Sequence, residues 1–403
     1  MEDRRRHSRF IVHTPPIKIK GAAEIPDGMK VAMLVDAHYP MKDGVVDAID
    51  ALKKGLEDRG HEVLLIAPDP GKDNRIDGVH YIPAKSFGTF AGYYLPIFPS
   101  DTLLKLKEMD ADVINVHGFA FMAVRGVTSG KILKKPVIVT FHTPMWSFLD
   151  DYSPIDPKFA LNVGWAYFRR LFKNADVTVA QMPSIAKELE DNGVRANIRT
   201  IPTGIDTERF RPGLDGRRIR DRYGIGERKT AIHVGRLCPE KCLDVLIKAF
   251  AGVDDAVLMI VGRGAIEKEL KDLAESLGVS DRVIFTGFVS EEELPLHYAA
   301  ADIAVSSSIY EAQCLAIMNA MACGLPVACP DGRAFADFIE DGENGFLYDA
   351  SVDGCASAIR KCLAAGPAVA AGARRTAEEY TMQRSIDAYV SLYEEAMEMK
   401  RRG

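Results

Sequence analysis

Short apolar runs alternate with amphipathic helical patterns along most of the chain, and the alternation begins twice. Runs of this length are typical of strands buried on both faces, as in parallel sheets covered by helices. The first predicted strands are Val31–Val35, Val63–Ile66, Val113–Val116, Val137–Phe141 and Val177–Ala180. The second series comprises Ala231–Val234, Ala256–Val261, Val283–Thr286, Ile303–Val305 and Val327–Ala328. The sequence therefore predicts an α/β fold with two doubly wound parallel sheets.

Helical periodicity fills the intervals between the predicted strands. The clearest predicted helices are Val45–Asp58, Thr102–Lys107, Phe159–Phe172, Lys241–Phe250, Ile266–Leu277, Glu291–Ala300 and Leu315–Cys323. The two series meet at residues 201–212, where Pro202, Gly204 and Pro212 interrupt the pattern as in a linker. A chain of 403 residues is longer than a single hydrophobic core usually supports. We therefore expect two domains, 29–205 and 206–384, that face each other across a cleft.

Composition narrows the class of protein. The first 28 residues begin with several arginines and lack the apolar stretch of a secretory signal, which predicts a mobile basic tail. The formal net charge of −6 argues against a general nucleic-acid binder, and no apolar run approaches the roughly 20 residues that span a bilayer. All seven cysteines lie in the second half without zinc-ligand spacing. We therefore expect reduced thiols, no metal site and a cytoplasmic protein.

Residues 306–327, SSSIYEAQCLAIMNAMACGLPV, carry the most information about function. A serine-rich strand end leads to Glu311, and a helix then runs through Met318 to Gly324. The first N–H groups of a helix are free to bind an anion, and open α/β sheets hold ligands at the carboxyl ends of their strands. The stretch therefore predicts a ligand site around the Glu311 turn.

A second polar turn, residues 235–241, joins a strand to the next helix and reads GRLCPEK. The positive end of a helix, together with the charges of Arg236 and Lys241, suits a diphosphate. The alternative is a surface cluster of ion pairs at the start of a helix, which this segment alone does not exclude.

Two positions in the first half of the chain have a similar setting. Gly44 begins a helix after the first strand, where a glycine lets the backbone approach a phosphate closely. His142 follows strand Val137–Phe141 and should point into the predicted cleft. An ordinary loop and a structural hydrogen-bonding histidine are the alternatives for these two positions.

In order and spacing, residues 29–397 resemble the retaining GT-B glycosyltransferases of the group 1 / family 4 type. The donor-sugar signature of that family reads E-G-F-G-L-x-x-x-E-A-M-A-C-G-x-P-V. Glu311 and the segment 320–327 match it. Cys314 stands in place of the second glycine of the signature, and Asn319 in place of its second glutamate.

Other segments carry the same resemblance. Residues 235–241 resemble the family motif G-R-L-x-x-E-K-G, with Cys242 at its last glycine. Residues 43–45 (DGV) resemble the P-x-x-x-G-G-V loop in the form found in diacylglycerol glucosyltransferases and sulfoquinovosyltransferases. Residues 141–143 resemble the F-H-T segment of phosphatidylinositol mannosyltransferases. The turns at Gly262 and at Gly287-Phe288-Val289 are similar to the V-G-x-G and G-F-V turns of the family.

The resemblance implies a GT-B fold of two Rossmann-like domains and a retaining, metal-independent transfer of sugar from a nucleotide donor, UDP- or GDP-linked, without a cofactor. Arg236 and Lys241 would hold the donor diphosphate, and Glu311 a hydroxyl of the donor sugar. His142 would contact the transferred sugar, and Asn319 would face the ribose. The implied donor-binding residues are Gly44, Gly235, Gly262, Phe288, Val289, Cys314, Leu315 and Asn319.

The acceptor stays open among lipid, glycan and small molecule. The aromatic-rich residues 87–98 form either a locally packed loop or an apolar surface for a lipid acceptor at the inner face of the membrane. Lys131, Lys134 and Lys135 lie nearby in sequence and would assist the second role. A sugar-nucleotide epimerase and a non-catalytic nucleotide-sugar binder remain alternatives. In similar enzymes the last helix, here within 385–403, returns to the first domain, which would be the acceptor side.

Overall fold

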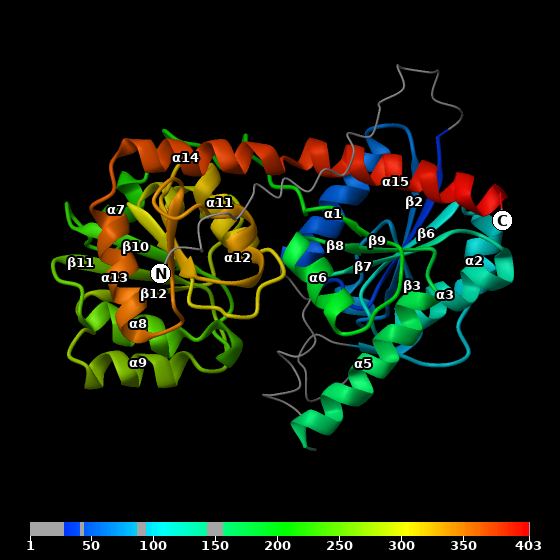
Figure 1. Ribbon diagram of the computed structural model, residues 1–403, viewed down its shortest axis with the longest axis horizontal. Coiled ribbons are helices and arrows are strands. Elements are labelled where there is room, and N and C mark those ends of the chain that lie inside the picture. Colours follow the sequence, from blue (N-terminus) through cyan, green and yellow to red (C-terminus); the bar gives the residue numbers. More distant parts are fainter. Residues whose placement is uncertain (1–27, 41–43, 87–93, 143–155, 403) are drawn as a thin grey trace, which may run out of the picture.

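The computed structural model describes residues 28–40, 44–86, 94–142 and 156–402. Within them the chain forms two parallel sheets side by side (Figure 1). The first sheet has the strand order β3-β2-β1-β6-β7-β8-β9. Its strands are β1 (Lys30–Val35), β2 (Glu62–Pro68), β3 (Val79–Ile82), β6 (Val113–His117), β7 (Val137–Phe141), β8 (Val177–Ala180) and β9 (Ile198–Thr200). Strands β4 (Ala84–Ser86) and β5 (Tyr94–Pro96) pair separately as an antiparallel hairpin. The predicted basic tail lies outside the described residues, apart from Gly28.

Helices cover both faces of the first sheet, because successive strand residues point to opposite sides and both sides are apolar. On β1, Leu34 packs in one core with Met122, whereas Met33 packs in another with Ile49 and Tyr393. The helices of this domain are α1 (Gly44–Glu57), α2 (Thr102–Met109), α3 (Phe121–Leu133), α5 (Pro157–Lys173), α6 (Pro183–Asp191) and, from the end of the chain, α15 (Met382–Arg402).

The second sheet has the order β12-β11-β10-β13-β14-β15, and all its pairs are parallel. Its strands are β10 (Lys229–Val234), β11 (Ala256–Val261), β12 (Val283–Gly287), β13 (Ile303–Val305), β14 (Val327–Pro330) and β15 (Gly345–Tyr348). The helices around it are α7 (Arg217–Arg222), α8 (Leu243–Ala251), α9 (Glu267–Ser276), α10 (Leu294–Ala299), α11 (Leu315–Ala322), α12 (Arg333–Phe338), α13 (Val352–Leu363) and α14 (Pro367–Ala377). No described helix has both the length and the apolar character needed to cross a membrane.

Both sheets reverse their strand order once, between β1 and β6 in the first and between β10 and β13 in the second. In doubly wound sheets, ligands bind in the crevice outside the carboxyl ends of the strands at such a reversal. Gly235 and Glu311 lie in the segments after β10 and β13, His117 is the last residue of β6, and Gly44 is the first residue of the helix after β1. The predicted α/β fold class is confirmed, and its topology brings the motif-bearing turns to the ligand-binding edge of each sheet.

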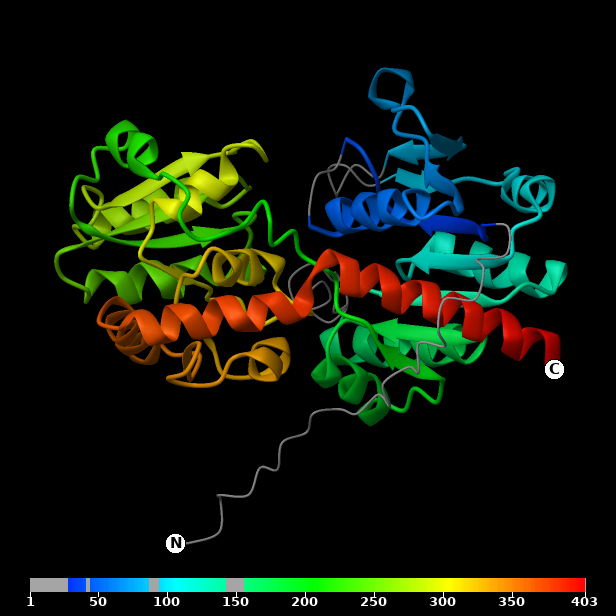
Figure 2. The ribbon, with the colours of Figure 1, turned by 90° about the horizontal axis from the view of Figure 1, so that it is seen from above.

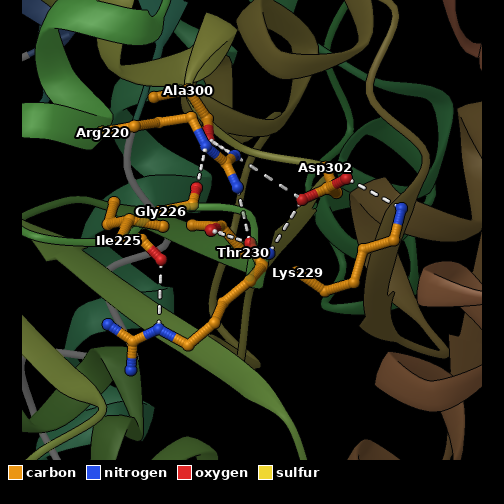
Figure 3. Close-up of polar contacts among 8 residues, drawn as sticks. Arg220, Ile225, Gly226, Lys229, Thr230, Ala300 and Asp302 are labelled. Atoms are coloured by element: carbon orange, nitrogen blue, oxygen red, sulfur yellow. Dashed lines mark hydrogen bonds and ion pairs between the residues drawn. The ribbon is translucent and has the colours of Figure 1, made fainter.

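A polar network lies at the amino-terminal ends of the strands of the second sheet (Figure 3). Asp302 accepts hydrogen bonds from the backbone N–H of Thr230 (2.8 Å) and from Lys229 Nζ (2.9 Å). Arg220 of α7 donates to the carbonyl oxygens of Ala300 (2.6 Å) and Gly226 (2.9 Å). These bonds hold α7 against the amino-terminal ends of the strands, away from the turns named above.

Two predicted helices begin later than expected. The helix predicted from Lys241 is α8, which begins at Leu243, because Cys242 has a left-handed backbone with φ 49°. The helix predicted from Glu291 is α10, which begins at Leu294. The strands β3, β9 and β15 were not predicted, because they are short strands at the edges of the sheets and are only partly buried.

The last helix crosses from the second domain to the first. Helices α14 and α15 run one after the other along both domains, with the short 3-10 helix Glu378–Tyr380 between them (Figures 1 and 2). Ile386, Tyr389 and Tyr393 of α15 are buried in the core that α1 and β1 form. Asn115 Nδ2 of β6 also donates a buried hydrogen bond to Tyr393 Oη (2.7 Å).

The two domains also touch directly through α6 and α12. The backbone N–H of Ser184 donates to Asp337 Oδ2 (3.0 Å), and Arg333 pairs with Glu188 (3.4 Å). One hydrophobic cluster extends through this contact and includes residues of both sheets. The domains are therefore joined by a linker, a returning helix and a packed contact.

The buried bond between Asn115 and Tyr393 generates a stability prediction. Tyr393→Phe leaves the Asn115 N–H without its partner, so we expect a loss of about 1–3 kcal/mol in the free energy of unfolding. Glu398→Gln on the same helix removes only an exposed ion pair with Arg402 and should cost less than about 1 kcal/mol. Denaturant unfolding of the two variants and the wild type measures both values. Equal stability of Tyr393→Phe and the wild type would contradict the assigned role of this bond.

Candidate active site

The centre of the candidate site is an ion pair between two predicted residues. Lys241 Nζ lies 2.6 Å from Glu311 Oε1, and the two side chains are only 22% and 12% exposed. Lys241 ends the turn after β10, and Glu311 lies in the loop between β13 and α11. The ion pair therefore joins the two turns that the motifs predicted separately.

Both members of this pair are charged. Burial alone would raise the pKa of Glu311, but attraction to Lys241 and the hydrogen bond between them hold that pKa below its usual value. Burial likewise opposes the charge of Lys241, and the Glu311 carboxylate outweighs it and raises the lysine pKa. A fixed positive charge therefore lies beside a fixed carboxylate at the edge of the second sheet.

Two serines fasten the turns around this pair. Ser307 Oγ donates to the carbonyl oxygen of Lys241 (2.7 Å), and Ser308 Oγ donates to that of Glu240 (3.2 Å). Both serines are buried, and their hydroxyls satisfy two carbonyl groups of the turn after β10. The serine-rich strand end thus has a structural task that the sequence motif did not reveal.

His233 is a buried polar residue of the site that sequence reasoning missed. It interrupts the apolar strand β10, which was the available signal. Its Nδ1 bonds to the carbonyl oxygen of Val305 (3.2 Å), and its Nε2 has no partner among the described residues. Burial, with the charge of Lys241, lowers the pKa of His233 to about 4, so the ring is neutral. A Cβ on Gly235 would lie 3.2 Å from this Nε2, so the ring faces the predicted diphosphate turn.

The turns after β10, β11 and β12 are hydrogen-bonded to one another. Gly235 N–H donates to Val261 O (3.0 Å), and Gly262 N–H donates to Gly287 O (2.9 Å). Gly262 has φ 134°, and a Cβ there would lie 1.9 Å from Gly235 O. Only a glycine permits this approach, so Gly262 shapes the turn that presents the exposed Arg236.

Two cysteines occupy positions where the family motifs have glycine, and both have left-handed backbones. The φ of Cys242 is 49° and that of Cys314 is 65°. This conformation strains any residue with a Cβ, which explains a preference for glycine at both positions. Cys314 precedes Leu315, the first residue of α11, and burial raises the pKa of its thiol, so the sulfur stays protonated.

The first domain meets this site at the start of α1. A Cβ on Gly44 would lie 3.2 Å from Leu315 Cδ1, so the N-terminal ends of α1 and α11 lie close together. The N-terminal end of a helix carries partial positive charge and free N–H groups. Gly44 and Leu315, predicted from separate motifs, are thereby brought to one place.

His142 lies in a row of hydrogen-bonding side chains at the edge of the first sheet. Its Nε2 is 3.0 Å from His117 Nδ1, and its Nδ1 is 2.8 Å from Gln181 Nε2. Burial lowers the pKa of His142 to about 4 and holds the pKa of His117 well below its usual value, so both rings are neutral. Both ring nitrogens of His142 are thus engaged by protein groups. Gln181 was not predicted, and no local sequence pattern distinguished it.

The remaining predicted donor residues lie on the second domain. Phe288 is 58% exposed on the turn after β12, and Val289 next to it is half-buried. Asn319 is half-buried on α11, one turn after Leu315. All predicted site residues of this domain follow strand ends or lie on α11. No group of three potential metal ligands occurs within the described part of the chain.

Comparisons with known proteins agree with this architecture. Residues 42–209 match the model of Glycosyltransferase Family 4, and residues 215–381 match that of Glycosyl transferases group 1. The GDP-mannose-dependent alpha-mannosyltransferase of Mycobacterium tuberculosis is 30% identical over 79% of this chain and 84% of that protein. The alpha-monoglucosyldiacylglycerol synthase of Acholeplasma laidlawii is 28% identical, covering 80% and 85% of the two chains.

A solved structure extends the agreement to the fold. Sucrose-phosphate synthase from Thermosynechococcus elongatus superposes with a TM-score of 0.75 at 19% identity, covering 91% of this chain and 98% of that one. At this identity the likeness speaks for the fold alone, which is that of a GT-B glycosyltransferase. The sequence resemblance to this family is confirmed. The chain therefore belongs to the group 1 / family 4 glycosyltransferases and is an enzyme of the GT-B type.

Proposed function

We propose that this enzyme transfers a sugar from a nucleoside-diphosphate sugar to a lipid, with retention of anomeric configuration and without a metal ion. The observation that carries the proposal is the Lys241–Glu311 pair, which joins the turn that contains Arg236 to the loop before α11, where the start of α1 lies close by. The GDP-mannose dependence of one relative and the glycolipid product named for another support the donor and acceptor classes.

Transfer breaks the bond between the anomeric carbon and the diphosphate, so negative charge develops on the leaving group. We assign Arg236, Lys241 and the free N–H groups at the start of α11 to stabilise this charge. These groups are held in place before the reaction, because Lys241 is fixed by Glu311 and by the bond from Ser307 to its carbonyl oxygen. Preorganised charge of this kind lowers a barrier without reorganisation during the reaction.

Glu311 is assigned to bind a hydroxyl of the donor sugar and not to attack the anomeric carbon. Lys241 holds its carboxylate, and one carboxylate does not supply the pair of opposed acids that glycosidases use. The His142 ring is fastened by His117 and Gln181, so we assign contact with the transferred sugar to the peptide group of His142 at the end of β7. Phe288 and Val289 would face the base, and Asn319 the ribose.

A lipid acceptor is supported by the distribution of exposed apolar side chains. Of the fourteen large apolar residues that are exposed in the described chain, nine lie between residues 97 and 163. Phe98, from the end of the predicted aromatic segment, is 79% exposed, and Phe121 and Val124 share the outer face of α3. Lys131 continues this face, and Lys134 caps the helix. Apolar side chains beside lysines suit the surface of an anionic membrane, so we place the enzyme at the cytoplasmic face.

The diphosphate assignment is tested at Arg236. Arg236→Ala should lower kcat by roughly 100- to 1,000-fold, equivalent to about 2.7–4 kcal/mol, which is the usual cost of losing one donor to a developing anion. Lys248→Ala on α8 removes a lysine that forms a surface ion pair with Asp244, and it should act like the wild type. Steady-state kinetics with an accepted donor measures both variants. Wild-type turnover in Arg236→Ala would refute the assignment.

Removal of metal ions tests the proposed chemistry. The enzyme should transfer sugar from a UDP- or GDP-sugar to diacylglycerol or phosphatidylinositol vesicles in the presence of EDTA, because the cations that neutralise the leaving group belong to the chain. Chromatography of labelled lipid measures the product, and NMR of its anomeric proton reports the configuration. Activity that is lost with EDTA and restored by magnesium would contradict the proposal. Conversion of the donor to an epimer, or binding without turnover, would instead favour the alternative functions.

The lipid-facing surface is tested with vesicles that lack acceptor. Replacing Phe121 and Val124 by serine should weaken sedimentation with anionic phosphatidylglycerol vesicles by roughly 10-fold or more, since each buried apolar side chain contributes about 1.5–3 kcal/mol. Replacing Leu277, another exposed apolar residue on the second domain, by serine should leave binding unchanged. Equal binding by the two variants would show that the outer face of α3 does not form the membrane contact.

A further inference from the structure

Gln313 joins the donor loop to the interdomain linker. Its Oε1 accepts a hydrogen bond from the backbone N–H of Thr203 (2.7 Å), and its Nε2 donates to the carbonyl oxygen of Thr203 (2.7 Å). The side chain is 4% exposed, and Nε2 also lies 2.9 Å from Met318 Sδ. The amide therefore satisfies both backbone groups of one linker residue, as a neighbouring strand would.

The linker at Thr203 is fastened on its other side by the start of α15. Ser385 Oγ donates to Pro202 O (2.8 Å), and Met382 N–H donates to Ile205 O (3.0 Å). A Cβ on Gly204 would lie 2.4 Å from Met382 Cα, so the two chain segments are in contact. Gln313 thus binds the linker at the place where the linker and the start of α15, which both connect the domains, lie side by side.

The same amide lies two residues after Glu311 in the donor loop. Lys241 holds that loop at Glu311, and Thr203 holds it at Gln313. The family signature has phenylalanine at this position, and an aromatic ring cannot form these hydrogen bonds. The connection between loop and linker is consequently a property of this chain's own residue and is not implied by membership of the family.

Thr203 also connects this contact to the first-domain part of the site. Thr203 and Gly204 line a cavity of about 10 Å³ together with His117, His142 and Tyr389. That volume corresponds to about one water molecule. His117 Nε2 has no partner in the described part of the chain. One linker residue therefore separates the buried amide of the donor loop from the imidazole pair of the first sheet.

We propose that Gln313 is a positioning residue that fixes the Glu311 loop relative to the interdomain linker, so that donor binding and domain orientation change together. This inference rests on the proposed function in assigning the donor to the Glu311 loop. Displacement of the loop then moves Thr203, and displacement of the linker moves Glu311 relative to Lys241. A misplacement on the order of 1 Å in such a site can cost about 100-fold in rate.

Gln313→Met tests the proposal, because methionine keeps the volume of the side chain and removes both hydrogen bonds. We expect kcat/KM for the donor to fall about 10- to 100-fold. Calorimetric affinity for UDP or GDP alone, which does not need the sugar-binding carboxylate, should stay within roughly 3-fold, and this also shows that the variant is folded. Gln383→Met on the exposed face of α15 is the matched control and should equal the wild type. Wild-type kcat/KM in Gln313→Met would overturn the proposal.

Hydrogen exchange gives a second readout that does not need turnover. Without ligand, Gln313→Met should speed exchange of the Thr203 amide about 10-fold or more, whereas Gln383→Met should not. In the wild type, saturating UDP or GDP should slow exchange in residues 201–205 and 306–315 together, and in Gln313→Met only in 306–315. Equal exchange rates of residues 201–205 in the wild type with and without nucleotide would overturn the proposal. If no donor is turned over or bound, the proposed function fails, and the ligand-free Thr203 result still decides whether Gln313 holds the linker.

Discussion

The ion pair between Lys241 and Glu311 is the interaction on which the candidate site depends. The two opposite charges are mostly removed from water, and each stabilises the other, because an unpaired charge in the same place would carry a large desolvation free energy. Their contact fixes the distance between the turn after β10 and the loop before α11. Ser307 and Ser308 then satisfy the carbonyl groups of the first turn. The two turns to which we assign the donor diphosphate and the donor sugar are therefore held together by charge.

Sequence patterns predicted the parts of this molecule whose cause is local. Apolar runs predicted the central strands, and turn residues such as Gly235 and Glu311 marked the candidate site at the strand ends. Contacts between distant residues had no such signal: Lys241 and Glu311 are 70 positions apart, and Thr203 and Gln313 are 110 apart. The start of α8 was misplaced because a left-handed Cys242 can be recognised only from the backbone. Short edge strands such as β15 depend on their neighbours more than on their own residues.

The linker is more than a tether between two rigid units. Its Ile201, Ile205 and Phe210 side chains are buried, so it is part of the packed interior. It is hydrogen-bonded to α15 on one side and to Gln313 on the other. Any relative rotation of the domains must therefore be absorbed by bonds that also shape the loop that carries Glu311. Under the proposed function, such an arrangement couples contact with the donor to domain orientation through ordinary hydrogen bonds.

The returning helix has a consequence for how the polypeptide is made. Chains emerge from the ribosome in sequence order, and early domains generally fold first. Here the face of β1 that carries Met33 is covered by Tyr393 and its neighbours on α15, which are synthesised after the entire second sheet. Until then an apolar surface of the first sheet lacks its final cover. The first domain can complete its core only after the second domain has emerged. The domain that is synthesised first is therefore the one whose core is completed last.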